Sequence, residues 1–103
     1  MALLAMTAAQ RAKALAKAAE ARMARRALLA EVASGAVGVA EVFERSGQDL
    51  AGRTRVVQVL RAVPGYGPAR VTALMATSGV EAKRRVGALN EQQRERLLRA
   101  LIS

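Results

Sequence analysis

Apolar residues recur at the spacing of an α-helix in four separate parts of the chain. Each set contains the i, i+3, i+4 pattern, or part of it, that places side chains on one face of a helix. The sets are Val39, Val42 and Phe43; Val56, Val59, Leu60 and Val63; Val71, Leu74 and Met75; and Leu97, Leu98 and Leu101. The pattern therefore predicts four helices in the second and third parts of the chain, and no strand.

A fifth and longer helix is predicted near the N-terminus. Thr7 and Gln10 have the spacing of a capping box, in which each side chain bonds the backbone amide of the other residue. From Ala8 to about Val32 nearly every residue is a strong helix former, and Ser34 and Gly35 then favour an end. Its candidate core positions are Leu28, Leu29 and Val32. Because they lie at one end, we expect the helix to dock by its C-terminal turns and to project by its N-terminal ones.

Capping residues and prolines set the other helix boundaries. We expect Thr54 to cap the helix that begins near Val56, Pro64 to stop it, and Pro68 to occupy the first turn of the next helix, which Gly79 closes.

An irregular connection over residues 80–89 is expected before the last helix. Asn90, with Gln93 three residues later, has the spacing of a second capping box. The predicted fold is all-α, with an extended basic N-terminal helix in residues 1–33 and a small helical domain in residues 34–103.

Composition narrows the chemistry that the chain can perform. It has 103 residues, enough for one modest core, and only 2% are aromatic, so Leu, Val, Met and Ala must build that core. The absence of Cys and His excludes thiolate and imidazole metal sites, cysteine nucleophiles and histidine bases. We expect no cofactor, no metal and no enzymatic activity. The apolar start, Met1 to Met6, is too short for a signal sequence and no segment is long enough for a membrane span, so we expect a soluble cytoplasmic protein.

The charge of the chain is strongly positive and unevenly distributed. Seventeen Lys and Arg residues against eight Asp and Glu residues give a net charge of +9. Residues 11–26 carry +5, residues 27–52 carry −3 and residues 53–103 carry +7. Two basic regions therefore flank an acidic one, as expected of a protein whose partner is a polyanion such as nucleic acid.

The segment that joins the helix ending near Val63 to the helix beginning at Pro68 is the best candidate for a binding site. Pro64, Gly65, Tyr66 and Gly67 form a tight hairpin from which a new helix opens, and we expect Gly67 to need a positive φ. A helix N-terminus attracts anions because its first amides lack partners. A hairpin alone could simply join two helices, but Arg70 follows it closely and three consecutive cations occur further on. The candidate contacts are Pro64, Gly65, Tyr66, Gly67, Arg70, Lys83, Arg84 and Arg85.

These residues resemble the actinobacterial integration host factor family over nearly the whole chain. The resemblance includes the hairpin with Arg70, and the segments Gly79-Val80 and Arg84-Arg85-Val86. Met75, Leu89, Arg94 and Leu97-Leu98 also match. It implies a helix-two-turns-helix module and duplex DNA binding without strong sequence preference. It further implies a nucleoid-associated role in DNA organisation and assistance to a site-specific recombinase.

The chain departs from the family pattern at two places. The family typically has Lys where this chain has Pro68, and Arg then Gly where this chain has Gly87 then Ala88. Two cations are therefore missing, and Lys83 is a candidate replacement.

The N-terminal helix offers a second candidate DNA surface. At 100° per residue four arginines fall within one sector, while Lys13 and Lys17 lie opposite. The four are Arg11, Arg22, Arg25 and Arg26. A solvated helix face is the alternative interpretation, and the lack of a large apolar face argues against a membrane surface.

Related modules have other functions, and the residues of this chain bear on each of them. Glycosylases of the formamidopyrimidine type use an N-terminal proline followed by glutamate, whereas this chain begins Met1-Ala2-Leu3. Tyr66 as a recombinase nucleophile would need further residues around the phosphate. A related module in a small-subunit ribosomal protein keeps RNA binding open as the alternative. We expect a monomer, since no apolar stripe is left over for self-association.

Overall fold

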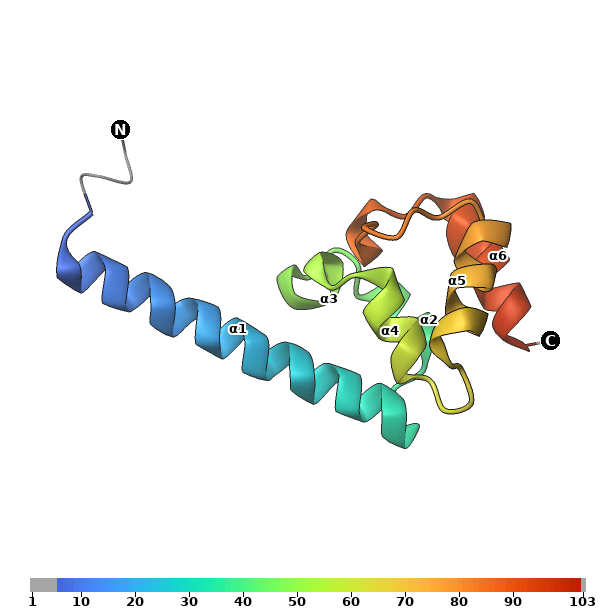
Figure 1. Cartoon of the computed structure of the whole chain (residues 1–103), viewed down its shortest axis with the longest axis horizontal. Helices are drawn as coiled ribbons and strands as arrows, with labels where there is room; N and C mark the ends of the chain where they lie inside the picture. Colours follow the sequence, from blue (N-terminus) through green and yellow to red (C-terminus); the bar gives the residue numbers. More distant parts are fainter. Residues whose placement is uncertain (1–5, 103) are drawn as a thin grey trace.

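The computed structural model describes residues 6–102, which form six α-helices and one 3-10 helix (Figure 1). In chain order these are α1 (Ala8–Ser34), α2 (Val39–Glu44), α3 (Asp49–Arg53), α4 (Val56–Ala62), α5 (Pro68–Thr77), η2 (Val86–Ala88) and α6 (Glu91–Ile102). The described residues contain no strand, only one isolated antiparallel bridge between Arg55 and Arg85. The all-α prediction, with a long first helix followed by a small helical domain, is confirmed.

Helix α1 is a long rod that lies along one edge of the domain (Figure 1). Its predicted capping box is present: the Gln10 amide donates to the Thr7 hydroxyl oxygen at 3.1 Å, and the Thr7 amide donates to Gln10 Oε1 at 2.8 Å. All residues from 7 to 18 are exposed, whereas Leu28 and Val32 are buried against the domain. The helix therefore docks by its C-terminal turns, as predicted.

Helix α3 and the position of Thr54 differ from the sequence prediction. Thr54 follows the five-residue helix α3, which was not predicted, and Arg55, not Thr54, precedes α4. The buried Thr54 hydroxyl donates to the Leu50 carbonyl oxygen at 2.7 Å, so it closes the end of α3. The prediction that Thr54 caps α4 is wrong because Arg55 is the residue that precedes the helix, and no side chain caps the α4 N-terminus.

The core is aliphatic, with one phenylalanine. Its fully buried apolar members come from α2, α4, α5, η2 and α6. These elements pack together near the C-terminal end of α1 (Figure 1). The largest of them are Leu60, Leu97, Val42, Val56, Val59, Val71 and Val86. Leu29, Val39, Val63, Leu74, Leu98 and Leu101 are partly buried around this cluster. The predicted apolar stripes are thus the inward faces of their helices.

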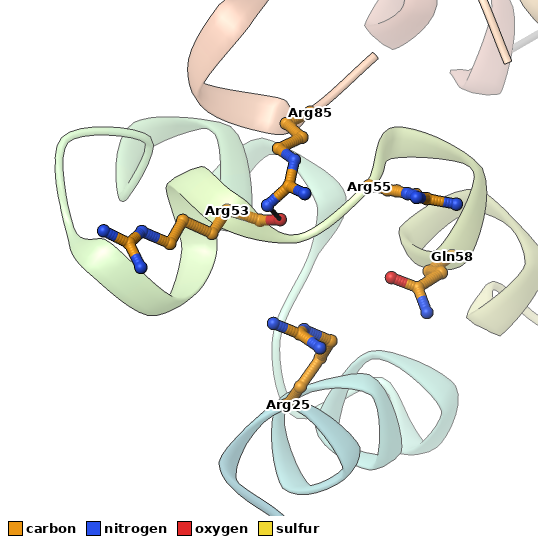
Figure 2. A pocket seen from close by; sticks show the side chains of 5 residues that line it. All are labelled: Arg25, Arg53, Arg55, Gln58 and Arg85. Carbon is orange, nitrogen blue, oxygen red and sulfur yellow. Dashed lines mark hydrogen bonds between the residues drawn. The ribbon is translucent and has the colours of Figure 1, made fainter. Parts of the chain in front are cut away.

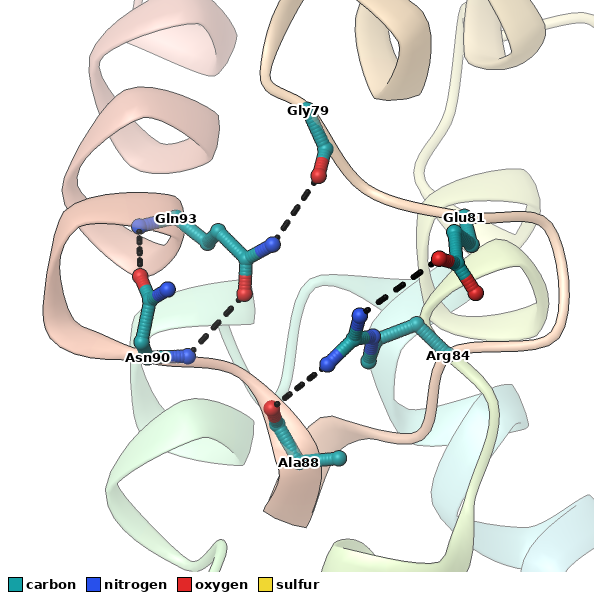
Figure 3. Close-up of polar contacts among 6 residues, drawn as sticks. All are labelled: Gly79, Glu81, Arg84, Ala88, Asn90 and Gln93. Carbon is teal, nitrogen blue, oxygen red and sulfur yellow. Dashed lines mark hydrogen bonds and ion pairs between the residues drawn. The ribbon is translucent and has the colours of Figure 1, made fainter.

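The connection before α6 is held by Gln93 (Figure 3). The Gln93 amide donates to Asn90 Oδ1 at 2.8 Å, and the Asn90 amide donates to Gln93 Oε1 at 3.1 Å, so the second predicted capping box is also present. Gln93 Nε2 donates to the Gly79 carbonyl oxygen at 2.9 Å, which ties the end of α5 to the start of α6. None of the helices described is long and apolar enough to cross a membrane.

Candidate nucleic-acid interface

The turn between α4 and α5 is an exposed hairpin whose tight position is Gly65. Gly65 has φ +87°, in the left-handed region that favours glycine. Gly67 has φ −77°, so the expectation that Gly67 needs a positive φ is wrong. The Tyr66 amide donates to the Val63 carbonyl oxygen at 3.2 Å, which closes the turn around Pro64 and Gly65.

The N-terminus of α5 opens from this hairpin with unpartnered backbone amides. Pro68 occupies the first turn, no side chain caps the helix, and the Val71 amide bonds the Gly67 carbonyl oxygen at 3.0 Å. The amides of Ala69 and Arg70 have no acceptor among residues 6–102. Two free donors at the positive end of a helix dipole, in an exposed turn, form a place where a phosphate oxygen can bind.

Tyr66 lies across the base of the hairpin, partly buried. Its hydroxyl donates to the Leu101 carbonyl oxygen of α6 at 3.2 Å, and the Arg70 guanidinium lies 4.2 Å from the centre of its ring. Arg70 Nη1 also lies 3.5 Å from the Gly65 carbonyl oxygen. These contacts fix Arg70 beside the free amides, and they give the Tyr66 hydroxyl a structural partner.

Arg84 and Arg85 lie in the connection before η2, and each is fixed by the backbone. Arg84 Nη1 donates to the Ala88 carbonyl oxygen at 3.3 Å and Arg84 Nη2 lies 3.9 Å from Glu81 Oε1 (Figure 3). Arg85 Nη1 donates to the Arg53 carbonyl oxygen at 3.2 Å (Figure 2). Lys83 is exposed beside them.

The backbone bridge brings two arginines side by side. The Val56 amide donates to the Arg84 carbonyl oxygen at 3.0 Å and the Val86 amide donates to the Thr54 carbonyl oxygen at 2.9 Å. These two bonds flank Arg55 and Arg85, so the pair is of the type whose side chains approach most closely. Neither Arg55 nor Arg85 has an ion pair with a carboxylate within the described part of the chain.

The hairpin and the bridge lie at opposite ends of α4. The bridge precedes Val56, and the hairpin follows Ala62. A helix of this length measures about 10 Å at 1.5 Å per residue. The predicted contacts thus form two groups, one with Arg70 and one with Arg84 and Arg85, rather than a single cluster.

Three of the four α1 arginines predicted to contact DNA lie beside the helical domain that follows α1. Arg22, Arg25 and Arg26 line a hollow together with Leu29, also of α1, and Gln58 of α4. Arg25 also lines a second hollow of about 190 Å³, with Arg53, Arg55, Gln58 and Arg85 (Figure 2). Arg11 is exposed on the projecting turns, about 16 Å along the helix from Arg22. The basic face of α1 is therefore continuous with the bridge.

Arg53, Arg55 and Gln58 are not among the contacts predicted from the sequence. The positions of these side chains depend on the bridge between residues 55 and 85 and on the docking of α1. No local pattern signals either contact. Their only sequence signal is the basic character of Arg53 and Arg55.

Comparison with known proteins places the chain in a family. The model of the S13-like H2TH domain matches residues 32–101. The integration host factor of Mycobacterium tuberculosis (strain ATCC 25618 / H37Rv) is 34% identical over 99 residues, which are 95% of this chain and 94% of that protein. The chain belongs to the actinobacterial integration host factor family. The resemblance inferred from the sequence is thereby confirmed, as is the helix-two-turns-helix (H2TH) module.

A solved structure of an integration host factor has the same fold. The structure of sIHF bound to an 8bp palindromic DNA matches with a TM-score of 0.77 and 28% sequence identity, over 82% of this chain and 96% of that chain. The match extends the family assignment from sequence to architecture.

Proposed function

We propose that this protein is a nucleoid-associated protein that binds duplex DNA through the phosphate backbone. The observation that carries the proposal is the α5 N-terminus, where the free amides of Ala69 and Arg70 open from an exposed glycine hairpin. The likeness to a protein solved with bound DNA supports it. So does the net charge of +9.

The mechanism we propose is a backbone clamp with two groups of contacts. Free amides and Arg70 bind phosphate at the hairpin, with Pro64, Gly65, Tyr66 and Gly67 forming the close surface. Lys83, Arg84 and Arg85 bind phosphate at the other end of α4. Arginine suits this role because its fork of donors matches two phosphate oxygens. Phosphate contacts position a protein without reading bases, so binding is largely independent of sequence.

The cellular role follows from such binding. We propose that the protein organises DNA in the nucleoid and assists site-specific recombination beside a recombinase, without catalysis of its own. The bond of the Tyr66 hydroxyl to the Leu101 carbonyl oxygen supports a structural role for this tyrosine. We further propose that it acts as a monomer in the cytoplasm.

Duplex RNA is the second candidate partner, because the matching family model is described as S13-like. The test compares affinities for duplex DNA, duplex RNA and single strands of equal length at matched salt. We expect duplex DNA to bind most tightly. Preference for duplex RNA would replace the proposal with the RNA alternative, and preference for single strands would contradict both.

A further inference from the structure

A hollow lined by four arginines lies where α1 packs beside the segment that joins α3 to α4. Arg25, Arg53, Arg55, Gln58 and Arg85 line this space of about 190 Å³, hereafter the arginine hollow (Figure 2). No acidic residue lines it. The Arg53 guanidinium points away, with Nε 3.6 Å from Asp49 Oδ1, so its own charge is partly compensated. Arg25, Arg55 and Arg85 are not paired in this way.

Arg25 is the least satisfied of these side chains. It is half-buried on α1 and points toward the backbone between Arg53 and Arg55 (Figure 2). Its Nε is buried and has no hydrogen-bond partner. A buried donor without an acceptor costs free energy, and charged donors cost most. Arg25 therefore lines the hollow with a guanidinium group whose hydrogen bonding is incomplete, and an anion there would compensate its charge.

The backbone bridge holds two arginines opposite each other beside Arg25, with their guanidinium groups turned to different sides (Figure 2). Arg55 and Arg85 are directly opposite in the bridge, and like charges at opposite positions destabilise a strand pair. The bond from Arg85 Nη1 to the Arg53 carbonyl oxygen holds one of them at the edge of the hollow. An anion in the hollow would relieve this repulsion and would accept from Arg25.

We propose that the arginine hollow binds one phosphate group of the DNA backbone. This inference rests on the proposed function. A water molecule occupies about 30 Å³, so the hollow admits a phosphate group with some of its water. Because Arg25 belongs to α1 while Arg55 and Arg85 belong to the module, one phosphate joins the two parts. The first helix and the H2TH module then grip the same duplex.

The test uses the full-length protein and two variants with equal loss of charge. Arg25→Gln removes the guanidinium from the hollow. Lys13→Gln removes a charge from the opposite side of α1, where the side chain is exposed. Affinity for a short labelled duplex is measured against salt concentration by anisotropy. In parallel, the Nε–Hε resonance of Arg25 is followed by NMR in the wild-type protein, and is assigned by its loss in Arg25→Gln.

We expect Arg25→Gln to bind about tenfold more weakly and to lower the logarithmic salt slope by about 0.9, as for one lost phosphate contact. Lys13→Gln should leave the slope nearly unchanged. The Arg25 resonance should shift when duplex is added. Equal slopes for the two variants would overturn the proposal. So would a resonance that stays in place at saturating duplex, because Arg25 would then act without touching phosphate.

A pyrophosphate titration without DNA separates the sources of phosphate and the two proposals. If pyrophosphate shifts the Arg25 resonance and duplex does not, the hollow is a site for free phosphate and the backbone assignment is wrong. If the wild-type protein binds no duplex, the proposed function fails. In that case a shift with pyrophosphate still supports a phosphate site in the hollow, and no shift removes it.

Discussion

Gly87 lies directly against Gly52, backbone to backbone, where η2 packs on α3. A Cβ at position 87 would lie 3.0 Å from the Gly52 carbonyl oxygen and 3.3 Å from the Ser46 carbonyl oxygen. A Cβ at position 52 would collide with the Ser46 carbonyl oxygen. The arginine expected at position 87 from the family resemblance is thus sterically unfavourable in this chain. The contact gives a physical reason for the glycine at position 87, one of the two positions of the second departure.

Ala88, by contrast, can accept a longer side chain. It is exposed, and its hydrogen bonds are made by its backbone alone: its amide donates to the Arg85 carbonyl oxygen at 2.9 Å and its carbonyl oxygen accepts from Arg84. We expect Ala88→Arg to strengthen duplex binding and to steepen the salt slope by about 0.9, since it adds a cation beside Arg84 and Arg85. Anisotropy titrations over a range of salt check this result.

The matched control is Gly87→Arg, which adds the same charge one residue earlier. We expect it to lower stability by about 1–3 kcal/mol through overpacking against Gly52. Thermal unfolding measures the difference. Equal stability of the two variants would show that the contact between Gly52 and Gly87 does not constrain this segment.

The two hairpin glycines should respond differently to alanine. Gly65→Ala forces a side chain into the left-handed region, so we expect a loss of stability of about 1–2 kcal/mol. Gly67→Ala should leave stability nearly unchanged, because φ there is −77° and the added Cβ meets nothing. It should nevertheless weaken duplex binding, because the methyl group obstructs phosphate at the α5 N-terminus. Full affinity in Gly67→Ala would remove this turn from the interface.

Tyr66→Phe tests whether the tyrosine hydroxyl has a chemical role. The change removes the hydrogen bond to the Leu101 carbonyl oxygen and leaves the ring under Arg70. We expect a stability loss of about 1 kcal/mol and unchanged duplex affinity. Covalent protein–DNA adducts formed by the wild-type protein and absent from Tyr66→Phe would contradict the proposal that the protein is not an enzyme.

Features that depend on neighbouring residues could be predicted from the sequence. Both capping boxes, Thr7 with Gln10 and Asn90 with Gln93, need only three-residue spacing, and both are present. The apolar stripes identified the core for the same reason, because helix periodicity is local.

Features that depend on distant contacts could not be predicted. Helix α3 has five residues and contains Gly52, so its stability comes from packing on η2 rather than from propensity. The arginine hollow exists because residues 55 and 85 pair and Arg25 docks beside them. The prediction of a positive φ at Gly67 was wrong, and the residue with positive φ is Gly65. The local sequence shows that the hairpin has two glycines but not which of them adopts the left-handed conformation.

The association state is a further prediction. The exposed large apolar side chains of the described residues are Leu15 and Met23, both on α1 and eight residues apart, so they do not form a broad apolar surface. We expect a monomer of 10.9 kDa in light scattering at micromolar concentration. A stable dimer would contradict this prediction and would call for an interface on another face.

The backbone clamp is tested most directly by the salt dependence of Arg84→Ala combined with Arg85→Ala. These side chains bond the carbonyl oxygens of Ala88 and Arg53, so we expect a small loss of stability together with a large loss of affinity. The matched control combines Lys13→Ala with Arg96→Ala, which removes two exposed cations outside the interface. The account predicts that the first double variant lowers the logarithmic salt slope by roughly 2, equally for all duplex sequences, while the control leaves it nearly unchanged. A parental slope in the first variant, or a loss confined to one sequence, would contradict the account.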